Sequence, residues 1–515
     1  MIEAIRIENL RSIQDSGYIN FKALNILVGT NSSGKSTFLR SFPLLSQSIN
    51  KSLRGPISWF DVTSVDFGDY VTAKNKFASE DETIRFSFII KRISAHIRPT
   101  RIRYFSLGRR YGVIGDFFDE KSPIEVTISL NNDVKGTFID RVIIKFKEFN
   151  IDMSVEKRNS DVKIIINKKI DMTNYGVKSK WNFTTNHGLM PMFYYKDEED
   201  FRTQTLNLAV KELAQFCDKR FKKQERIEFL FNIYDISKDS LLKSIKRTEI
   251  ISLKKKTENW NINNKIFQEV YYLWITSQIP SILNAIDDEL NMFYWDCGYI
   301  APSRAEASRY YRNQELQVED VDAYGRNLQE FISSLSEKQY ESYSSFTQDI
   351  LGVKIGVTNK TGHQSIFLEN KNGKFNLADV GFGYSQILPI ITKLWHITQK
   401  RQYEYNPQRC VVIEQPELHL HPAMQAKIAD AFIKTIKIAE ENQIKIKLFI
   451  ETHSQALINR LGRRVAEKII NNDDVSLILF EKDDEEKNSK IKQTYYKTNG
   501  QIKDWPYGFF DPKDM

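Results

Sequence analysis

The sequence predicts an α/β fold, in which a mixed sheet with helices is joined by an antiparallel β subdomain and an inserted helical unit. Three patterns predict it. An apolar run at 23–28 leads through a glycine-rich turn into an amphipathic segment at 35–50, as a buried strand followed by a helix would. Stretches of β-branched alternation occupy much of 83–170, and residues from about 200 to 295 have helical spacing. With 515 residues, 41% of them hydrophobic, the chain can bury a sizeable core.

The glycine-rich turn has the pattern of a phosphate-binding loop, in which two glycines five residues apart are followed by a lysine and a hydroxyl residue. Its sequence, from Gly29 to Thr37, is GTNSSGKST. Glycines allow several backbone N–H groups to point inward and let the chain approach a phosphate closely. Lys35 would then contact the β- and γ-phosphates, and the Ser36 hydroxyl would complete a Mg²⁺ shell. We therefore predict nucleotide binding at this strand–loop–helix unit.

The remaining elements are expected in chain order around this unit. Residues 2–28 predict a short β-meander that leads into the loop. Strands of an antiparallel sheet beside the nucleotide are expected at about 83–93, 122–130, 140–153 and 161–170, with a basic loop or hairpin extension at 94–121. A strand at 299–304, a helix at about 327–335 and a strand pair at 352–370 follow the helical unit. We expect three regions: an N-terminal lobe (1–195), a helical insertion (196–298) and a C-terminal lobe (299–515).

Polar residues at the ends of predicted elements mark the second half of a site. Leu377–Gln386 places two glycines and a serine at the start of an apolar helix, which favours anion binding. The apolar strand Cys410–Ile413 ends in carboxylates, which suit holding Mg²⁺ or polarising a water at the carboxyl edge of a sheet. A third strand, Ile444–Ile450, is followed by Glu-Thr-His-Ser, whose histidine, His453, would reach a γ-phosphate or an attacking water. His419 and His421 lack a third ligand at suitable spacing, so no zinc site is expected.

The order of these motifs resembles that of ABC-type ATPases. Because 379 residues separate Lys35 from Glu414, the arrangement looks more like the heads of chromosome-maintenance, recombination-repair and overcoming-lysogenization-defect (OLD) ATPases than a compact transporter subunit. The segments NSSGKST, ADVGFGYSQ, IEQPELHLHP, ETHS and the terminal WPYGFFD most closely resemble a bacterial AAA-type ATPase family of anti-phage defence, similar to the ATPases of PARIS, Septu-type and retron systems. The resemblance covers 1–70 and 299–511 and says little about 71–298.

The resemblance implies a P-loop NTPase head of the ABC type, in which two heads sandwich ATP between the loop of one and the signature segment (Leu377–Gln386) of the other. It implies that phosphate and Mg²⁺ are held by Asn31, Gly34, Lys35, Ser36 and Thr37. It implies that Ser385, with Gly381 and Gly383, caps the γ-phosphate of the opposite head, that Glu414 takes the acidic Mg²⁺–water position, and that His453 takes the sensor position.

Two departures from the resemblance bear on function. ABC-type sites usually follow the first acid with a glutamate that polarises the attacking water, but here that position holds Gln415, which cannot accept a proton. Either Glu417 substitutes, or hydrolysis is slow and ATP mainly holds the dimer closed. OLD nucleases carry a Toprim nuclease after the ATPase, whereas only 62 residues follow His453 here. We therefore expect any nuclease or toxic activity to belong to a partner subunit.

Charge and cysteine content limit which binding partners and which cellular compartment are expected. Residues 91–110 carry seven basic side chains and no acid, and residues 219–256 carry a net charge of +7 in a chain of net charge +8. These two basic zones predict contacts with nucleic acid or an acidic partner, although a solvated charged face remains the alternative. Three cysteines without metal-like spacing predict reduced thiols. The absence of a long apolar run predicts a cytoplasmic protein with no membrane contact.

Three functions are consistent with these patterns. The leading hypothesis is an ATP-binding and hydrolysing sensor or scaffold in phage defence, at least a homodimer or a higher-order ring, that controls a separate effector and responds to a phage protein. The alternative is a DNA-maintenance or repair ATPase that clamps duplex DNA through the basic zones. A housekeeping ATPase unrelated to defence is the third.

Overall fold

The computed structural model describes residues 2–91, 123–147, 149–168, 170–176, 179–182, 188–194, 201–218, 230, 237–314, 316–360, 362–400, 408–482 and 488–505. The chain divides into two compact units, each built from separate stretches of sequence. The first comprises Met1–Ile5, Lys51–Ile57 and Thr83–Asn291. The second comprises Arg6–Asn50, Ser58–Glu82 and Met292–Met515. Among the helices that the structure describes, none is both long and apolar enough to span a membrane.

The second unit is organised around a six-stranded sheet. The strands follow the order β13 (Gly298–Ile300), β18 (Gln408–Glu414), β19 (Lys445–Glu451), β4 (Leu24–Gly29), β20 (Val475–Glu481) and β21 (Lys490–Tyr495). The first five strands are parallel, and β21 pairs antiparallel with β20. Every residue of β4 and β18 is buried, as in a sheet whose two faces are both covered. The N-terminal strand β4 thus lies between two strands of the C-terminal half of the chain.

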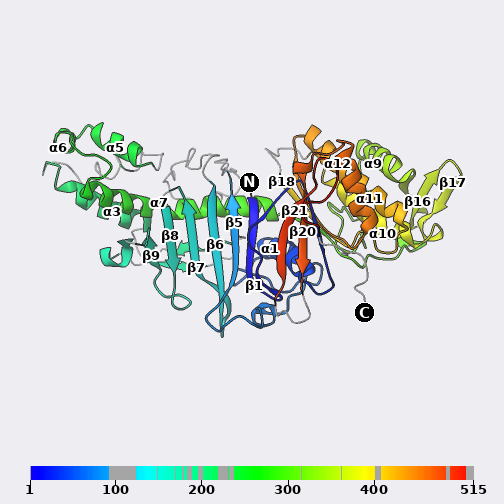
Figure 1. Ribbon diagram of the computed structural model, residues 1–515, viewed down its shortest axis with the longest axis horizontal. Helices are drawn as coiled ribbons and strands as arrows, with labels where there is room; N and C mark the ends of the chain where they lie inside the picture. The colour runs from blue at the N-terminus through cyan, green and yellow to red at the C-terminus, as the bar shows by residue number, and fades with distance from the viewer. Residues whose placement is uncertain are drawn as a thin grey trace. The chain divides into compact units, whose positions relative to one another are not determined.

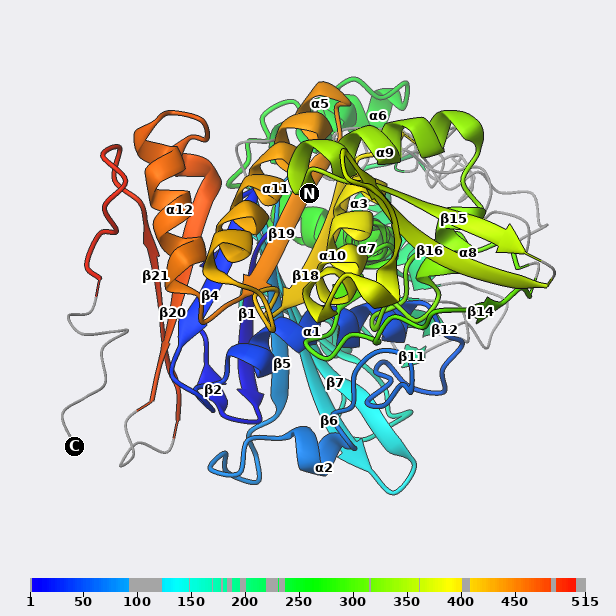
Figure 2. The same ribbon diagram turned by 90° about the vertical axis from the view of Figure 1, so that its right-hand side faces the viewer.

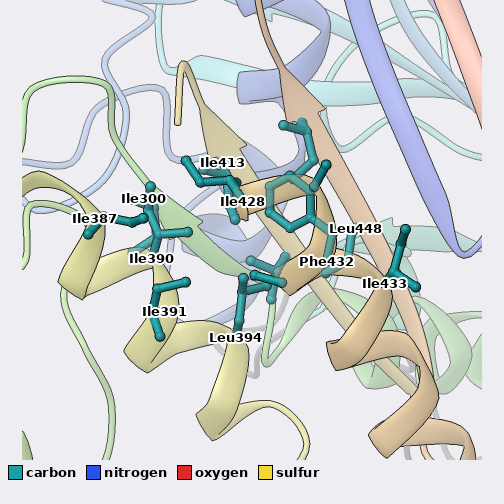
Figure 3. Close-up of a cluster of buried hydrophobic side chains, with 14 of the residues drawn as sticks. Ile300, Ile387, Ile390, Ile391, Leu394, Ile413, Ile428, Phe432, Ile433 and Leu448 are labelled. Carbon is teal, nitrogen blue, oxygen red and sulfur yellow. The ribbon is translucent and has the colours of Figure 1, made fainter. Parts of the chain in front are cut away.

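Helices pack on both faces of this sheet. On one face, α10 (Phe382–His396) and α11 (Pro422–Glu441) pack on alternate strand residues, in a cluster that contains Ile413 and Leu448 (Figure 3). Figure 2 shows these two helices in front of β18 and β19. On the other face, Phe42 of α1 (Lys35–Ile49) packs on Phe449 with ring centroids 4.3 Å apart. Because successive strand residues point to opposite faces, Leu448 and Phe449 serve two separate helix layers.

Smaller elements complete the second unit. A four-stranded antiparallel sheet contains β14 (Tyr311–Arg312), β16 (His363–Asn370), β15 (Lys354–Lys360) and β17 (Gly373–Asn376). The helices α8 (Leu328–Ser333) and α9 (Glu337–Leu351) lie beside this small sheet, and α12 (Gln455–Ala466) follows β19 in the chain. Ser336 and Gln339 form a capping box at the start of α9, which satisfies backbone donors there. Near the N-terminus β1 (Ile2–Leu10), of which only Arg6–Leu10 belong to this unit, pairs antiparallel with β2 (Ile13–Asp15), and β3 (Ile19–Asn20) and α2 (Tyr70–Ala73) are short.

The first unit contains an antiparallel sheet (Figure 1). Its strands are β5 (Ile84–Ile90), β6 (Ile124–Asp133), β7 (Gly136–Phe146), β8 (Phe149–Ser154), β9 (Lys163–Ile166) and β10 (Ile170–Asp171), paired in that order. Buried and more exposed residues alternate along β8, which is the pattern of a sheet with one covered face. The covered face packs on α7, where Phe149 and Tyr271 lie 5.6 Å apart between ring centroids.

Helices of the same unit include α3 (Phe201–Ala214), α5 (Lys238–Lys246), α6 (Ile251–Lys256) and most of α7 (Lys265–Tyr294); a two-stranded pair, β11 (Lys180–Asn182) and β12 (Met192–Tyr194), belongs to it as well. The helices of the expected insertion therefore share a compact unit with the antiparallel strands. The expected boundaries at 195/196 and 298/299 stay predictions about how the chain is organised.

The mixed α/β fold with an antiparallel subdomain, expected from the sequence, is confirmed. Two expected strands were wrong. The segment 140–153 is two strands, β7 and β8, that pair with each other, and the segment 161–170 contains β9 and the start of the short β10, which also pair antiparallel. Lys147 adopts a φ of 47° at the reversal between β7 and β8, although no glycine, proline or asparagine marks the turn. Of the basic zones, all but Lys91 of 91–110 and much of 219–256 lie outside the described residues, as does most of the terminal motif after Trp505.

Candidate functional site

A cleft in the second unit opens over the phosphate-binding loop. Its lining residues are Ser12, Asn31, Ser32, Ser33, Gly34, Lys35, Ser36, Thr37, Gln415, Glu451 and His453. The loop leaves β4 at Gly29, where an added Cβ would lie 2.2 Å from the backbone oxygen of Phe480. It enters α1 at Gly34, whose φ of 95° favours glycine. The two motif glycines are therefore required for different reasons, a close strand contact and a left-handed turn.

Lys35 is the cation of this cleft. Its side chain is buried, and Nζ donates to the carbonyl oxygens of Gly29 at 3.0 Å and Thr30 at 2.6 Å. Burial lowers the pKa of Lys35, while the nearby Glu451 carboxylate acts in the opposite direction. The ammonium is thus held inside the loop by carbonyl oxygens, which a phosphate oxygen can replace as acceptor.

Two carboxylates lie side by side at the carboxyl edge of the sheet. Glu414 ends β18, Glu451 ends β19, and the parallel register pairs them directly. Glu414 is buried and accepts two hydrogen bonds from Arg40, with both N···O distances 2.7 Å, and one from the Tyr299 hydroxyl at 2.7 Å. The sequence predicted Glu414 as an acid of the Mg²⁺ site, yet the cleft lining does not include it.

Glu451 occupies the position beside the loop. The Ser36 hydroxyl lies 2.8 and 3.0 Å from its two carboxylate oxygens. Burial, and next the Glu414 carboxylate, raise the pKa of Glu451 to about 7, whereas the Ser36 hydrogen bond and the Lys35 charge lower it. Glu451 is therefore the carboxylate that the fold brings to the predicted Mg²⁺ ligand Ser36.

The segment after β18 carries Gln415 into the cleft. Gln415 adopts a φ of 42°, uncommon for a residue with a side chain, and its backbone N–H donates to the Glu451 carbonyl at 2.9 Å. Arg304 fixes this turn because its guanidinium donates to the carbonyls of Glu414 at 3.3 Å and Gln415 at 3.2 Å. The turn is held from both sides, so the backbone fixes Gln415 in the lining of the cleft.

Glu417 follows β18 and His453 follows β19, and a hydrogen bond joins the two segments although their side chains have different surroundings. His453 lines the cleft, and partial desolvation and the Lys35 ammonium lower its pKa, which favours the neutral imidazole. Glu417 is buried and accepts a hydrogen bond from the His453 backbone N–H at 2.6 Å. Burial raises the pKa of Glu417. Its side chain does not line the cleft, so the geometry supports positioning of the His453 segment.

The signature segment stands apart from this cleft. Gly381 precedes α10 with a φ of 89°, and the Ser385 hydroxyl donates to the Phe382 carbonyl at 2.7 Å. Phe382 is 42% exposed and packs edge-on against His419, with ring centroids 4.9 Å apart. Gly381, Gly383 and Ser385, all described, are absent from the lining of the loop cleft of their own chain.

The donor set of the cleft fits Mg²⁺. The ion prefers oxygen ligands and is usually held by one or two carboxylates together with phosphates and waters. The Ser36 hydroxyl and the Glu451 carboxylate supply such oxygens. Within the described part of the chain, no three His, Cys, Asp or Glu residues gather as a metal cluster, and this Mg²⁺ arrangement requires none.

The structure thus brings together the predicted residues Asn31, Gly34, Lys35, Ser36, Thr37, Gln415 and His453. Glu414 and Glu417 adjoin residues of the cleft but do not line it, and the signature residues do not line it either. Sequence reasoning gave no role to Glu451, Arg40, Tyr299, Arg304 or Ser12. Glu451 alone had a signal, an acid at a strand end inside the Glu-Thr-His-Ser motif. The contacts of Arg40 and Tyr299 with Glu414 can be recognised only once the neighbouring strands and their register are known.

A protein family described as an AAA ATPase domain matches residues 1–458 of this chain. A second, described as a protein of unknown function (DUF3696), matches residues 470–514. None of the curated proteins compared with the chain matches it.

Among solved structures, the Smc head domain with an extended coiled coil from Pyrococcus furiosus, bound to the C-terminal domain of ScpA, is 12% identical over 96% of each chain, with a TM-score of 0.33. The SMC head domain from Thermotoga maritima is 8% identical over 95% of this chain and 98% of that chain, with a TM-score of 0.34. These values describe a distant likeness.

Proposed function

This chain belongs to the AAA ATPase domain family, and from that premise we propose that it is an ATP-dependent oligomeric sensor or scaffold of bacterial anti-phage defence that controls a separate effector, a nuclease or a toxin. Membership of the family implies the use of ATP and Mg²⁺. The observation that carries the ATP switch is the cleft where Lys35, Ser36, Glu451 and His453 meet. The defence role is supported by the resemblance of the motif segments.

Each residue of the cleft has a task that follows from its contacts. The N-terminus of α1 presents backbone donors to phosphate. Lys35 exchanges its loop carbonyl partners for phosphate oxygens, and Mg²⁺, when bound beside Ser36, neutralises phosphate charge. The neutral His453 accepts or donates one hydrogen bond toward the terminal phosphate or a water.

The site is proposed to be completed by a second copy of the chain. Ser385 and the two signature glycines lie outside the cleft of their own chain and present a helix N-terminus, which favours an anion. Two chains that exchange these elements would form a closed homodimer around ATP, the minimum state, and a higher-order ring is built from such pairs. Closure then reports ATP occupancy to the effector and is released by a phage protein.

Hydrolysis is proposed to be slow. The amide of Gln415 lies in the cleft and orients water without accepting its proton. Glu417, the other candidate base, is occupied by the His453 N–H. Multiple-turnover hydrolysis tests this directly: Glu417→Gln should leave the measured rate nearly unchanged. Loss of turnover in Glu417→Gln but not in Gln415→Ala would instead identify Glu417 as the base.

The mass of the protein with and without ATP tests the split site. Wild type should shift from monomer to an even-numbered oligomer when Mg²⁺ and ATP are added. Ser385→Arg should bind nucleotide normally and fail to associate, since the bulky cation blocks the neighbouring phosphate-binding loop. Thr498→Arg, an equivalent change at an exposed turn, is the matched control. Association by Ser385→Arg as strong as that of wild type would contradict the proposal.

A DNA clamp is the second candidate, and the described part of the second basic zone favours it. The helix α6 ends in Lys254, Lys255 and Lys256, all exposed. Affinity for duplex DNA that falls steeply with salt would support a clamp, because phosphate contacts release counterions. No binding to long duplex DNA at low salt would remove it.

Copurification of the native operon from the cytoplasm would identify the effector. An adjacent effector gene would separate a defence role from a housekeeping role.

A further inference from the structure

We propose that Glu451, rather than Glu414, supplies the protein carboxylate of the Mg²⁺ site beside Ser36. The proposal rests on the proposed ATP-binding function, because the metal accompanies the nucleotide. It assigns the metal to the strand next to the phosphate-binding strand β4, one strand closer than the acidic motif that begins at Glu414.

The first support is the contact between Ser36 and Glu451. The Ser36 hydroxyl lies 2.8 and 3.0 Å from the two oxygens of Glu451, and both residues line the cleft with Lys35. A hydroxyl and a carboxylate at this separation are placed to share one small cation, as Mg²⁺ takes oxygen ligands about 2.1 Å away. The carboxylate is also within the electrostatic influence of Lys35, the phosphate-binding cation.

The second support is that both carboxylate oxygens of Glu414 already accept hydrogen bonds from other side chains. The Arg40 guanidinium donates one hydrogen bond to each carboxylate oxygen of Glu414, both at 2.7 Å, and the Tyr299 hydroxyl donates to one of these oxygens at 2.7 Å. Such a two-pronged pair of a guanidinium with a carboxylate is among the stronger protein hydrogen-bond arrangements. Binding of a metal by Glu414 would require its release from a partly buried ion pair, which is unfavourable because it leaves Arg40 without its counter-charge.

The geometry of α1 explains why the two acids have different partners. Ser36 and Arg40 are four residues apart on the helix, so they project from the same face one turn apart. The facing strand ends carry Glu451 and Glu414 in direct register. Ser36 meets one acid and Arg40 meets the other. The helix therefore divides the two carboxylates between a metal position and a protein cation.

Binding of Mn²⁺, a paramagnetic substitute for Mg²⁺, tests the assignment without measuring hydrolysis. The probe is Mn²⁺ titrated into the full chain with a non-hydrolysable ATP analogue and followed by electron paramagnetic resonance. Glu451→Gln should weaken Mn²⁺ binding at least about tenfold. Glu414→Gln should change it much less, because that carboxylate serves Arg40. As a control, the affinity for a fluorescent nucleotide is measured in EDTA, with no metal present. It should be similar in Glu451→Gln and wild type.

Further variants keep the result interpretable. Glu330→Gln removes another buried carboxyl group of the same unit, on α8, and should bind Mn²⁺ as wild type does. Glu451→Asp retains the charge on a shorter side chain and should fall between wild type and Glu451→Gln, and thermal unfolding verifies that each variant is folded. Wild-type Mn²⁺ affinity in Glu451→Gln, or a larger loss in Glu414→Gln, overturns the assignment alone. Failure of the wild-type chain to bind any nucleotide overturns the proposed function and the assignment with it.

Discussion

The two large sheets of the protein differ in how their residues are buried. In the parallel sheet of the second unit, β18 is buried along its whole length, whereas β8 of the antiparallel sheet alternates between buried and partly exposed residues. Helices cover both faces of the parallel sheet, and their packing leaves its carboxyl edge as the place where polar side chains collect. The antiparallel sheet instead distributes its charges along one face, as cross-strand pairs such as Arg141 with Asp152.

This difference explains where the chemistry lies. A parallel sheet ends all its strands in the same direction, so residues from β4, β18 and β19 that are far apart in sequence converge at one edge. Antiparallel neighbours end at opposite edges and cannot gather functional groups in this way. The cleft accordingly draws on the parallel sheet, and the antiparallel sheet contributes a scaffold of alternating residues.

The largest effect should come from a charge placed at a fully buried strand position, and in the parallel sheet adjacent residues are both of this kind. Val411→Asp and Val412→Asp, at adjacent positions of β18 that are both fully buried, should each cost several kcal/mol, because a carboxylate loses its hydration on either face. In β7, Val142→Asp should be as harmful as these. Thermal unfolding and the yield of folded protein measure the effect. Tolerance of either change in β18 would mean that one face of the sheet is open.

Replacement of Lys35 should separate binding from stability. Lys35→Ala should weaken nucleotide binding about 10- to 100-fold, the loss expected for a charged hydrogen bond, and should prevent closure of the heads. Titration with a fluorescent nucleotide measures this, and cells carrying the variant should lose activity. Arg158→Ala, which breaks an ion pair with Asp133 in the antiparallel unit, is the control and should bind as wild type. Full cellular activity of Lys35→Ala would refute the ATP switch.

The antiparallel unit should contribute a pH dependence of its own. Asp287 of α7 is half-buried and accepts hydrogen bonds from the backbone of Leu189 at 2.8 Å and Met190 at 2.9 Å. Burial raises its pKa from 3.8 to about 7. Because the folded chain then binds a proton more tightly than the unfolded chain, this group's stabilisation is complete below about pH 4 and declines as the pH rises toward 7.

Chemical denaturation of the wild type and of Asp287→Asn between pH 4 and 8 checks this expectation. The variant should lack that part of the decline, so the difference in free energy of unfolding between the two proteins should change with pH. Asp239→Asn, at an exposed position of α5, should keep the wild-type profile. A pH-independent difference between wild type and Asp287→Asn would show that the carboxyl group does not titrate there.

The smallest effect should come from the exposed face of the antiparallel sheet. Lys145 pairs with Glu125 across β6 and β7 at 2.9 Å, and about half of its side chain is exposed. Lys145→Ala should change the free energy of unfolding by about 1 kcal/mol or less, as is usual for exposed ion pairs. Urea unfolding measures it, and a substantially larger loss would indicate that this face is covered.

The sequence predicted those parts of the site that depend on one continuous segment. The spacing of Gly29, Gly34 and Lys35 and the strand-end position of His453 were sufficient to place them, because strand, loop and helix are local. The contact between Ser36 and Glu451 was not predictable, since it depends on which strands are neighbours and on their register. The ion pair between Glu414 and Arg40 was not predictable for the same reason. The β7–β8 hairpin was not predicted because the chain reverses at Lys147 without a typical turn residue.

The position of β4 has a consequence for synthesis. Its sheet neighbours are β19 and β20, and the Ser36–Glu451 contact joins residues 415 positions apart. At translation rates of roughly 5–20 residues per second, β4 and α1 are synthesised on the order of 20 to 80 seconds before β19 and β20 emerge from the ribosome. An apolar strand without neighbours invites aggregation during this interval. Expression yield should therefore depend on chaperones that shield the first 50 residues until the last third of the chain arrives.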